Sequence, residues 1–423
     1  MLILNAAGLQ IRPSGSCQKG GRGMSEWKEY KISNIGKVVT GKTPRTSISD
    51  NYGSTIPFLS PSDDMESKYV PTTARCLTEK GLSEVKNCLI PKNSICVSCI
   101  GSDMGKSVIT DRPIVTNQQI NSIIPSESFD PHFVYYLMQG KRREIRFIGR
   151  NGTAVPILNK SAFSNLTITA PDIDEQHRIS SFLSALDDKI AVNRRICENL
   201  EAQAQALFKH WFIDFAPFKN GKFVESELGM IPEGWRVGTL EELCSFISRG
   251  LSPKYQLGTN ELVLGQTCVR NNIVTLNNAR EHQPKENCNK YVKKWDVLLN
   301  STGIGSLGRV GVVYFDMTNV CFDSHLTVVR TKEDIYRYYV GRNLLNRQKE
   351  LENMAVGSTG QTELPKKDVL VMPILIPNSD VLLEFNNIIE NIGKIYTLIE
   401  ENLRLSTLRD TLLPKLMSGQ IKV

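Results

Sequence analysis

The sequence predicts an α+β fold with two tandem β-rich domains, each followed by a long α-helix, the two helices pairing as an antiparallel coiled coil with pseudo-two-fold symmetry. Three observations predict this fold. The chain of 423 residues repeats itself once, each repeat begins with short strand-like runs, and each repeat ends with apolar residues at coiled-coil spacing. The segments that we expect are 1–23, 24–170, 171–224, 225–376 and 377–423.

The repeat is visible in matched residues. Trp27 and Trp235 open similar stretches 208 positions apart, and SICVSCIGSDMGK at 94–106 resembles DVLLNSTGIGSLGR at 296–309. Near the ends of the two copies the offset is 206 positions. Copies of roughly 205 residues are much longer than solenoid repeats, so the pattern indicates two domains that can be related by a pseudo-two-fold axis.

The first part of each copy is rich in short Val, Ile and Cys runs separated by Gly, Asn, Ser and Pro, which is typical of strands and turns. Apolar residues at helical spacing predict two shorter helices, at 131–146 and 334–353. Each globule is therefore expected to be β-rich with one or two small helices.

After Pro171 the period changes to that of a helix. Asp172 can cap it, and nine of ten positions taken at alternating steps of four and three are apolar, with Asn193 the polar one. A helix over 174–213 would be about 60 Å long. The echo after Pro377 is weaker, because its seam includes polar residues such as Glu384. The residues expected to pack the spacer helices are Leu183, Leu186, Ile190, Leu200, Leu207, Trp211, Ile395, Leu398, Leu405, Leu412 and Leu416.

Composition excludes some classes of protein. Lys and Arg total 51 against 44 acidic residues, a net charge of +7, which is compatible with a polyanionic partner without requiring one. Apolar runs stop at about eight residues, too short for a membrane helix. Ten scattered Cys predict no disulfide framework and favour a reducing cytoplasm. Residues 1–23 lack acidic residues and are expected to be a disordered arm or a non-native extension.

Several motifs imitate catalytic or cofactor sites. The sequence at 303–308 fits the dinucleotide fingerprint GxGxxG, but a strand-like run follows where a helix is required. The sequence at 101–107 is one residue short of a P-loop. Cys96 and Cys99 form a single CxxC that cannot complete a tetrahedral site alone. We therefore expect no catalytic residue, no metal ligand and no cofactor in this chain.

A family resemblance rests on four stretches: GTAVPILNK at 152–160, LDDKIAVNRR at 186–195, ALFKHWF at 206–212 and LRDTLLPKLMSG at 408–419. Together they resemble the specificity (S) subunit of type I restriction-modification systems. The similarity extends over residues 24–423, nearly the whole chain.

The resemblance implies a non-catalytic, cytoplasmic DNA-binding subunit. Each globule would be a target-recognition domain that reads half of a bipartite sequence in double-stranded DNA. The helices would be spacers that dock two methyltransferase (M) subunits, and restriction/translocase (R) subunits would join them. Adenine methylation and restriction, with S-adenosylmethionine, ATP and magnesium, would belong to those partners.

Residues that could read DNA are polar side chains in loops and at strand ends of each globule. Arg and Lys suit guanine, whereas Asn and Gln suit adenine. For any one of them, a solvated loop residue or a turn-stabilising amide remains the alternative. The candidates are Lys42, Thr43, Arg45, Ser102, Lys106, Asn117, Gln118, Gln119, Arg150 and Asn151 in the first copy, and Arg249, Lys254, Gln266, Arg270, Asn271, Ser306, Arg309, His325 and Gln361 in the second.

Two other classes of function remain open at this point. The chain could be a structural adaptor whose globules bind protein, or a self-contained DNA-modifying enzyme. The missing cofactor motif argues against the enzyme, and salt-sensitive, sequence-selective binding to duplex DNA would separate a specificity subunit from an adaptor.

Overall fold

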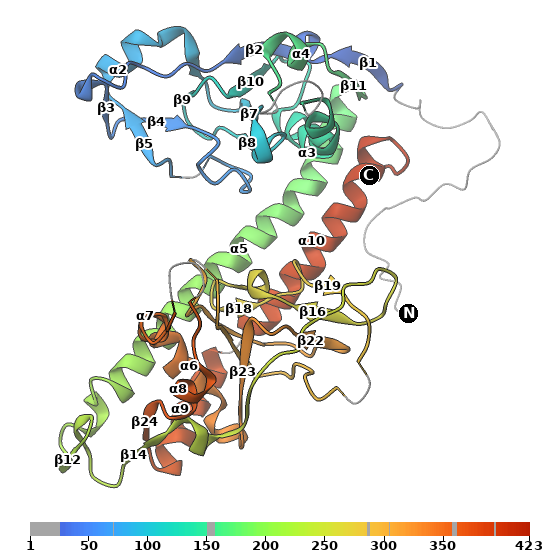
Figure 1. Cartoon of the computed structure of the whole chain (residues 1–423). Helices are drawn as coiled ribbons and strands as arrows, with labels where there is room; N and C mark the ends of the chain where they lie inside the picture. The colour runs from blue at the N-terminus through green and yellow to red at the C-terminus, as the bar shows by residue number, and fades with distance from the viewer. Residues whose placement is uncertain are drawn as a thin grey trace. The chain divides into compact units, whose positions relative to one another are not determined.

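The computed structural model describes residues 26–70, 72–149, 157–285, 288–303, 305–357, 362–392 and 395–423. The expected segment 1–23 and the candidates Arg150, Asn151 and Gln361 lie outside the described residues. The chain divides into two compact units, one formed by Met1–Val192 with Asn402–Val423 and the other by Asn193–Glu401. Each unit has its own sheets (Figure 1). Each also has its own hydrophobic cores.

The first unit is built on short strands, as the sequence predicts. A four-stranded sheet has the order β2 (Gly36–Thr40), β10 (Ile120–Pro125), β7 (Ile95–Ser98) and β8 (Ser107–Ile109). A five-stranded sheet has the order β3 (Tyr52–Gly53), β5 (Arg75–Leu77), β4 (Ile56–Leu59), β9 (Ile114–Thr116) and β6 (Leu89–Ile90). A separate ladder pairs β1 (Lys28–Lys31) with β11 (Thr167–Ala170).

Helix α3 (Pro131–Gly149) covers the four-stranded sheet of this unit (Figure 1). Its Phe133 and Met138 are fully buried in one cluster with Ile95 and Val97 of β7. The predicted helix at 131–146 is therefore confirmed and runs three residues further. The remaining helices of the first globule are α1 (Ile32–Ile35), α2 (Glu79–Glu84) and α4 (Lys160–Ser164).

The second unit repeats this plan with a six-stranded sheet, a three-stranded sheet and two ladders. The six-stranded sheet has the order β15 (Cys244–Arg249), β23 (Leu326–Thr331), β20 (Val297–Asn300), β21 (Val310–Val312), β18 (Ile273–Val274) and β17 (Val269–Arg270). The three-stranded sheet has the order β19 (Arg280–Glu281), β16 (Leu262–Leu264) and β22 (Val320–Phe322). The ladders pair β12 (Phe223–Ser226) with β13 (Gly229–Pro232), and β14 (Arg236–Thr239) with β24 (Pro373–Ile376).

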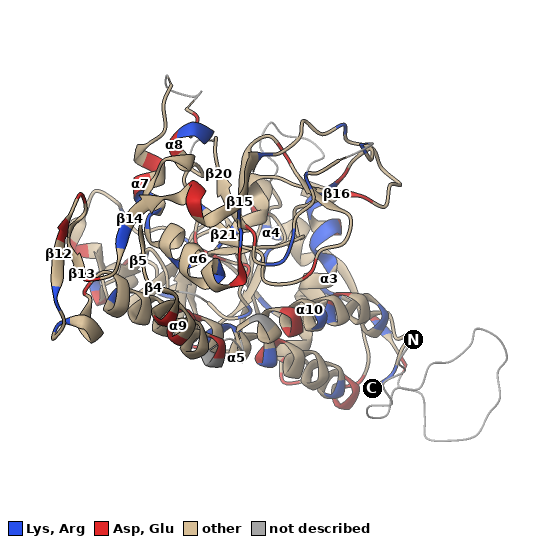
Figure 2. Cartoon of the chain, turned by 90° about the horizontal axis from the view of Figure 1, so that it is seen from below, with Lys and Arg blue, Asp and Glu red and all other residues tan. Residues whose placement is uncertain are grey.

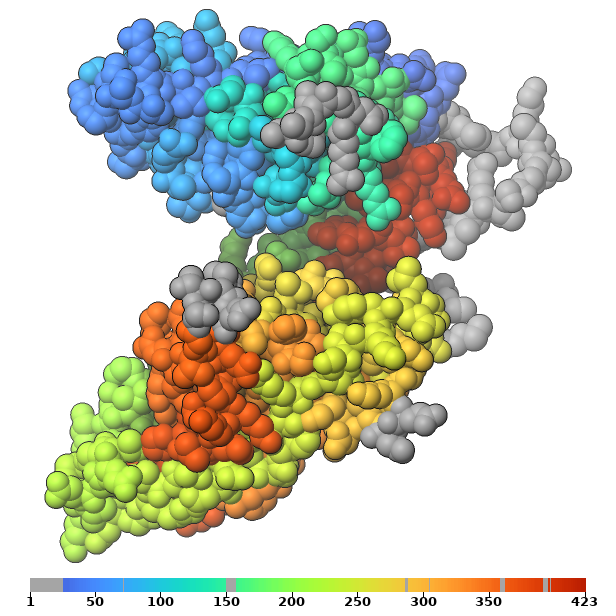
Figure 3. All heavy atoms as spheres, viewed as in Figure 1, coloured from blue at the N-terminus to red at the C-terminus, as the bar shows by residue number. Residues whose placement is uncertain are grey.

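The predicted helix at 334–353 is present as two helices, α6 (Arg337–Asn346) and α7 (Gln348–Asn353), after a short 3-10 turn at Asp334–Tyr336. In the space-filling view of Figure 3 this segment, in orange, packs directly against the yellow strand segments of the same unit. Tyr339 of α6 is buried in the largest core of the unit. The unit also holds α8 (Lys366–Leu370) and α9 (Ser379–Ile392).

The first long helix, α5, runs from Ile173 to Phe212, within one residue of the prediction at both ends. Asp172 caps it, because its Oδ1 accepts a hydrogen bond of 2.9 Å from the backbone N–H of Glu175. The first half of α5 belongs to the first unit and the second half to the second unit.

Helix α10 (Ile395–Met417) packs on α5 within each unit. In the first unit, Asp187 of α5 binds Arg409 of α10 at 2.7 Å, and Leu416 lies in one cluster with Ile179. In the second unit, Asn193 donates a hydrogen bond of 2.7 Å to Glu401. In each unit the chain direction of α10 is opposite to that of α5 (Figure 1), as the predicted antiparallel pair requires.

Helix α9 does not use the expected seam. Leu382, Phe385 and Ile389 form its buried face, whereas Glu384, which the repeat offset places on the seam, is exposed. These three residues are spaced three and four positions apart, so they form one apolar face that packs in the core of the second unit. There the ring centroid of Phe385 lies 4.8 Å from that of Phe212. Among the described helices, none combines the length and apolar character needed to cross a membrane.

Candidate DNA-reading loops

Three loops of the first unit meet at one end of its sheets. The backbone N–H of Lys42 donates to the carbonyl of Thr116 at 2.9 Å, and that of Cys99 donates to Gln119 at 2.9 Å. The N–H of Leu158 in turn donates to the carbonyl of Cys99 at 2.9 Å. These bonds bring the segments 41–43, 99–102 and 117–119 together, although the sequence places them far apart.

The second unit has the same frame at matching positions. Leu251 donates to Phe322 at 2.9 Å, Ser301 donates to His325 at 2.9 Å, and Leu364 donates to Ser301 at 2.8 Å. Each of these backbone bonds has its counterpart in the first unit, so the two loop ends can be aligned residue by residue. The duplication seen in the sequence is therefore a duplication of this loop frame.

A glycine is required at the same place in both frames. A Cβ on Gly41 would lie 2.2 Å from the carbonyl oxygen of Asn117, and a Cβ on Gly250 would lie 2.1 Å from that of Phe322. Both contacts are with backbone atoms, which cannot move aside without breaking the frame. This explains why the two glycines recur in the repeat.

The first frame carries a group of neutral polar side chains. The Thr43 hydroxyl donates to Gln118 Oε1 at 2.7 Å, and Asn117 Nδ2 donates to Gln119 Oε1 at 3.1 Å. Gln118 and Ser102 are exposed, whereas Asn117 is 9% exposed. Asn117 therefore shapes the turn, since its Oδ1 also accepts the N–H of Gln119 at 3.1 Å.

The cations of the first copy differ in how available they are. Lys42 and Arg45 are exposed. Lys106 is paired with Asp103 at 2.7 Å and with Glu66 at 3.2 Å, and Arg142 binds the same Glu66 at 3.1 Å. Burial lowers the pKa of Lys106 and the hydrogen bonds to the two carboxylates raise it, so the net shift is upward. Its charge is thus already compensated within the protein.

In the second frame, Gln266, Thr302 and His325 form a hydrogen-bonded group. Gln266 Nε2 donates to Thr302 Oγ1 at 2.7 Å, and that hydroxyl lies 2.8 Å from His325 Nδ1. Thr302 was not among the predicted residues, although its place in the repeated segment 296–309 could have signalled it. His325 is exposed, and its backbone N–H is held by Asp323 Oδ1 at 2.9 Å.

Arg249, Ser306 and Arg309 border this group. Arg249 donates to the carbonyl of Leu364 at 2.7 Å and binds Glu363 at 2.9 Å. The Ser306 hydroxyl bonds back to its own turn. Arg309 is exposed and donates to the carbonyl of Gly305 at 2.7 Å, which leaves its charge without a carboxylate partner among the described residues.

Three predicted residues of the second copy lie elsewhere. Arg270 and Asn271 are exposed at the turn between β17 and β18, at the edge of the six-stranded sheet. Asn271 has φ 53°, a left-handed conformation that Asn tolerates. Lys254 is exposed beside Gln283, whose N–H donates to its carbonyl at 2.8 Å.

The imitated motifs have structural roles. Gly303, Gly305 and Gly308 all have positive φ, and strand β21 follows them, so no helix N-terminus faces a nucleotide there. Cys96 and Cys99 are buried in the first unit, where burial raises the pKa of their thiols to about 12 and about 11. Neither thiol is poised to react.

The residues expected to pack the spacer helices are all at least partly buried. Those that are buried are Leu183, Ile190, Trp211, Ile395 and Leu416. Those that are partly buried are Leu186, Leu200, Leu207, Leu398, Leu405 and Leu412.

The comparisons with known proteins agree with this architecture. The family model described as "Type I restriction modification DNA specificity domain" matches residues 24–202 and 232–403. The type I restriction enzyme MjaIX specificity subunit of Methanocaldococcus jannaschii is 30% identical over 419 residues, which cover 94% of each chain. The HindI specificity subunit of Haemophilus influenzae is 32% identical over 179 residues, covering 41% of this chain and 39% of that one.

A solved structure, the S subunit of a type I restriction-modification system from M. genitalium, shares the fold. Its TM-score is 0.58 at 16% identity, and the match covers 94% of this chain and 98% of that one. With two matched domains that together span most of its length, the chain belongs to the family of type I restriction-modification DNA specificity subunits.

Proposed function

We propose that each globule reads one half of a bipartite sequence in double-stranded DNA and that this pair of half-sites sets the target of a type I complex. One observation carries the proposal. The same backbone frame presents different polar side chains in the two units, with Gln119 in the first at the position of His325 in the second. A shared frame with different side chains is what two different half-sites require.

The chemistry of the loops suits base edges in the major groove. Gln118 and Gln119 offer amides, which pair with adenine, whereas Arg309 offers a guanidinium, which pairs with guanine. Their backbones are fixed by the frame, so the side chains would meet DNA from a rigid support. His325 and Thr302 add a hydroxyl and an imidazole to the second surface.

Affinity would come from phosphate contacts by exposed cations near the loops, such as Lys42 and Arg45 in the first unit. Figure 2 shows Lys and Arg interspersed with Asp and Glu along α10 rather than gathered into one basic stripe on that helix. The helices are therefore better suited to protein partners than to DNA.

We assign to α5 and α10 the docking of two M subunits, to which R subunits would be added. On α5, Val192 of the first unit is 48% exposed and Ile196 of the second unit is 40% exposed, so each unit leaves apolar helix surface for a partner. Adenine methylation, restriction, S-adenosylmethionine, ATP and magnesium would all belong to those subunits. The proposed site of action is the cytoplasm.

The decisive experiment exchanges residues 24–170 for the equivalent domain of another S subunit and maps methylated sites by methylome sequencing. The expected result is that one half of the recognised motif changes while the other half and the spacing stay. Lengthening α5 should instead change the spacing alone. A continuous target, or a swap that alters both halves, would contradict independent reading by two globules.

A second experiment separates DNA recognition from a protein-binding adaptor. Lys42→Ala should weaken binding to duplex DNA equally for all sequences and lower the salt dependence by about one phosphate contact. Lys92→Ala is the matched control, because Lys92 is exposed just before β7, at the end opposite to the loop frame. Equal effects of the two substitutions, or binding that ignores salt, would favour the adaptor.

A further inference from the structure

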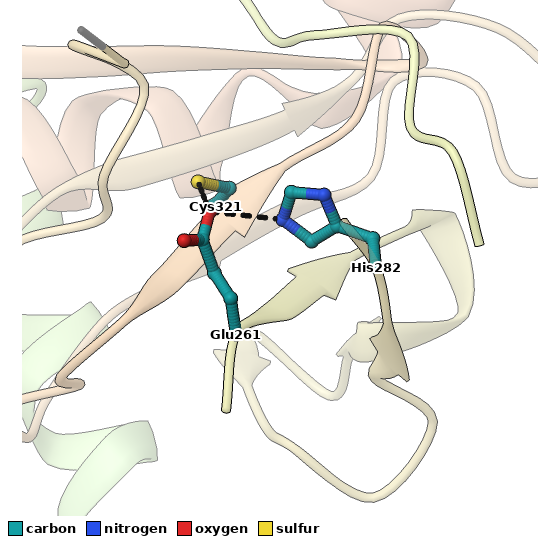
Figure 4. A group of neighbouring side chains, drawn as sticks. All are labelled: Glu261, His282 and Cys321. Carbon is teal, nitrogen blue, oxygen red and sulfur yellow. Dashed lines mark hydrogen bonds and ion pairs between the residues drawn. The ribbon is translucent and has the colours of Figure 1, made fainter. Parts of the chain in front are cut away.

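Three potential metal ligands meet in the small sheet of the second unit (Figure 4). Glu261 directly precedes β16, His282 directly follows β19, and Cys321 lies in the middle of β22. Glu261 Oε1 is 3.1 Å from His282 Nε2 and 3.2 Å from Cys321 Sγ. Because β19, β16 and β22 are neighbours in the sheet, the three ligand atoms lie close together.

The cluster is buried, and one of its polar atoms makes no hydrogen bond within the part of the chain that the structure describes. Glu261 is 6% exposed, His282 is 1% exposed and Cys321 is fully buried, in a cluster with the apolar side chains of Leu251 and Val263. His282 Nε2 is buried and makes no hydrogen bond to any described residue, despite its closeness to the carboxylate. Its polar neighbour is the Glu261 carboxylate at 3.1 Å, and a buried nitrogen that makes no hydrogen bond is costly.

Cys288 lies beside this group of three and is the candidate for a fourth ligand. Its Sγ lies 3.7 Å from Cys321 Sγ, and the backbone N–H of Lys290 donates to it at 3.4 Å. Two thiolates bound to one zinc ion at about 2.3 Å with a tetrahedral angle are about 3.8 Å apart, so the observed separation fits two ligands of one ion.

The ligand shell is supported from outside, as metal sites usually are. The Tyr291 hydroxyl donates to Glu261 Oε2 at 3.1 Å, which fixes the carboxylate and leaves Oε1 directed at the cluster. His282 also lines a pocket of about 200 Å³ with Leu251 and Lys285, which gives an ion a path from solvent.

In the first unit, the positions that align with the three ligand residues hold apolar side chains. The parallel pair β4–β9 corresponds to β16–β22, and the shared loop frame aligns Ile56 with Glu261 and Val115 with Cys321. Leu77, the partner of Ile56, then aligns with His282. Apolar packing in one copy has thus been replaced by three buried metal-binding groups in the other.

We propose that Glu261, His282, Cys288 and Cys321 form a tetrahedral site for a divalent zinc-class ion. Two sulfurs, a nitrogen and an oxygen are ligands that zinc accepts, and they suit the harder ions magnesium and calcium poorly. Four protein ligands leave no open position, so the ion is structural. It ties His282 and Cys288 to β16 and β22, within the globule that carries Gln266 and His325.

The test begins with the full-length chain, grown with added zinc and purified without chelator. We expect about one zinc ion per chain by mass spectrometry of the metal. Exchange for Co²⁺ should give a sulfur-to-cobalt charge-transfer band and the strong visible bands of tetrahedral cobalt. A chain that carries no zinc and gives no cobalt bands with excess Co²⁺ would overturn the proposal, as would a Cys288–Cys321 disulfide in freshly purified, zinc-free protein.

Variants of the full chain then identify the ligands. Cys321→Ser should weaken zinc binding by at least about 100-fold and diminish the charge-transfer band, whereas Tyr291→Phe should weaken it roughly 10-fold to 100-fold. Cys244→Ser is the matched control, since Cys244 is a half-buried thiol in β15 of the same unit, and it should keep the ion. If a variant fails to fold, thiol alkylation of the wild-type chain with and without zinc replaces it. Zinc should protect Cys288 and Cys321 from alkylation and leave Cys244 unprotected, and the reverse pattern would refute the assignment.

Discussion

The two globules share one backbone frame but differ in the sheet that contains the parallel pair β4–β9 in the first and β16–β22 in the second. In the first, Ile56, Leu77 and Val115 pack with the fully buried Phe58 in an apolar cluster. In the second, the aligned positions hold a carboxylate, an imidazole and a thiol. The frame is set by backbone hydrogen bonds and by the two glycines. The side chains in the sheet can therefore be apolar in one globule and polar in the other, provided that the buried polar groups have partners.

A second pair of aligned positions shows the same difference. In the first globule the backbone N–H of Ser94 donates to the Thr110 hydroxyl at 2.9 Å. In the second, the position of Ser94 is occupied by Asp296, which is fully buried and bound by Arg330 at 2.6 Å and 2.7 Å. Burial raises the pKa of Asp296 and Arg330 opposes this rise. The second globule therefore places more charge inside, and each charge needs a partner.

The largest effect is expected when one metal-type residue is placed in the apolar sheet. Leu77→His should lower the free energy of unfolding of the first globule by about 4 kcal/mol, because it loses apolar packing and buries an imidazole without a partner. Hydrogen exchange of the β5 and β9 amides, followed by mass spectrometry, measures the loss in that globule alone.

The control for this change is Leu77→Met, which nearly conserves volume and should cost less than about 1.5 kcal/mol. Added zinc should not restore Leu77→His, because Ile56 and Val115 offer no ligand atom. Rescue by zinc, or equal costs of the two substitutions, would show that the sheets of the two globules are not as different as their side chains indicate.

The second effect concerns how each globule holds α10. In the first unit Asp187 accepts from Arg409 at 2.7 Å and from the Tyr136 hydroxyl at 2.5 Å, so Asp187→Ala removes the acceptor of two donors. We expect a loss of about 3 kcal/mol, seen as faster hydrogen exchange over 405–416. Asn193→Ala, its counterpart in the second unit, should instead affect 395–401. An effect of Asp187→Ala confined to 395–401 would contradict the assignment of these contacts.

Much of this architecture could be predicted from the sequence. The long α5 and its Asp172 cap follow from heptad spacing, and the tandem domains follow from the repeat, because both are local or periodic signals. The buried face of α9 was mispredicted, because copying the seam of the first long helix onto the second placed Glu384 on the seam. The apolar residues around Phe385 form the buried face instead.

The sites were harder to predict, because they depend on pairing between distant strands. The repeat marks the segment that contains Thr302, but no spacing in the sequence predicts that Thr302 joins Gln266 to His325, because this contact forms only when β20 and β22 are folded. The same holds for Glu261 and Cys321, which are 60 residues apart and meet through a parallel strand pair. The expectation of no metal ligand came from searching for close Cys and His pairs, which this arrangement does not contain.

A smaller effect is expected from one aligned pair of cations. Lys106 and Arg309 occupy the same position in the two frames, but Lys106 is neutralised by Glu66 and Asp103. Arg309→Ala should therefore weaken DNA binding by about 1–3 kcal/mol and relax specificity in one half-site, whereas Lys106→Ala should change it little. Binding titrations with each half-site mutated in turn measure both. A larger loss from Lys106→Ala would mean that its ion pairs open on DNA.

The smallest effect is expected from the mildest exchange between the two sheets. Val115→Cys places a thiol where β9 of the first globule is fully buried, at the position of Cys321 in the second. A buried thiol behaves as a small hydrophobe, so the cost should stay below about 1.5 kcal/mol. The variant should bind no additional zinc, because a single sulfur among Ile56 and Leu77 completes no ligand set. Urea unfolding and metal content check the two statements separately. A large loss of stability here would mean that the apolar sheet does not tolerate a buried thiol. In that case the replacement of the apolar residues by Glu261, His282 and Cys321 would have required a bound metal from the first substitution onward.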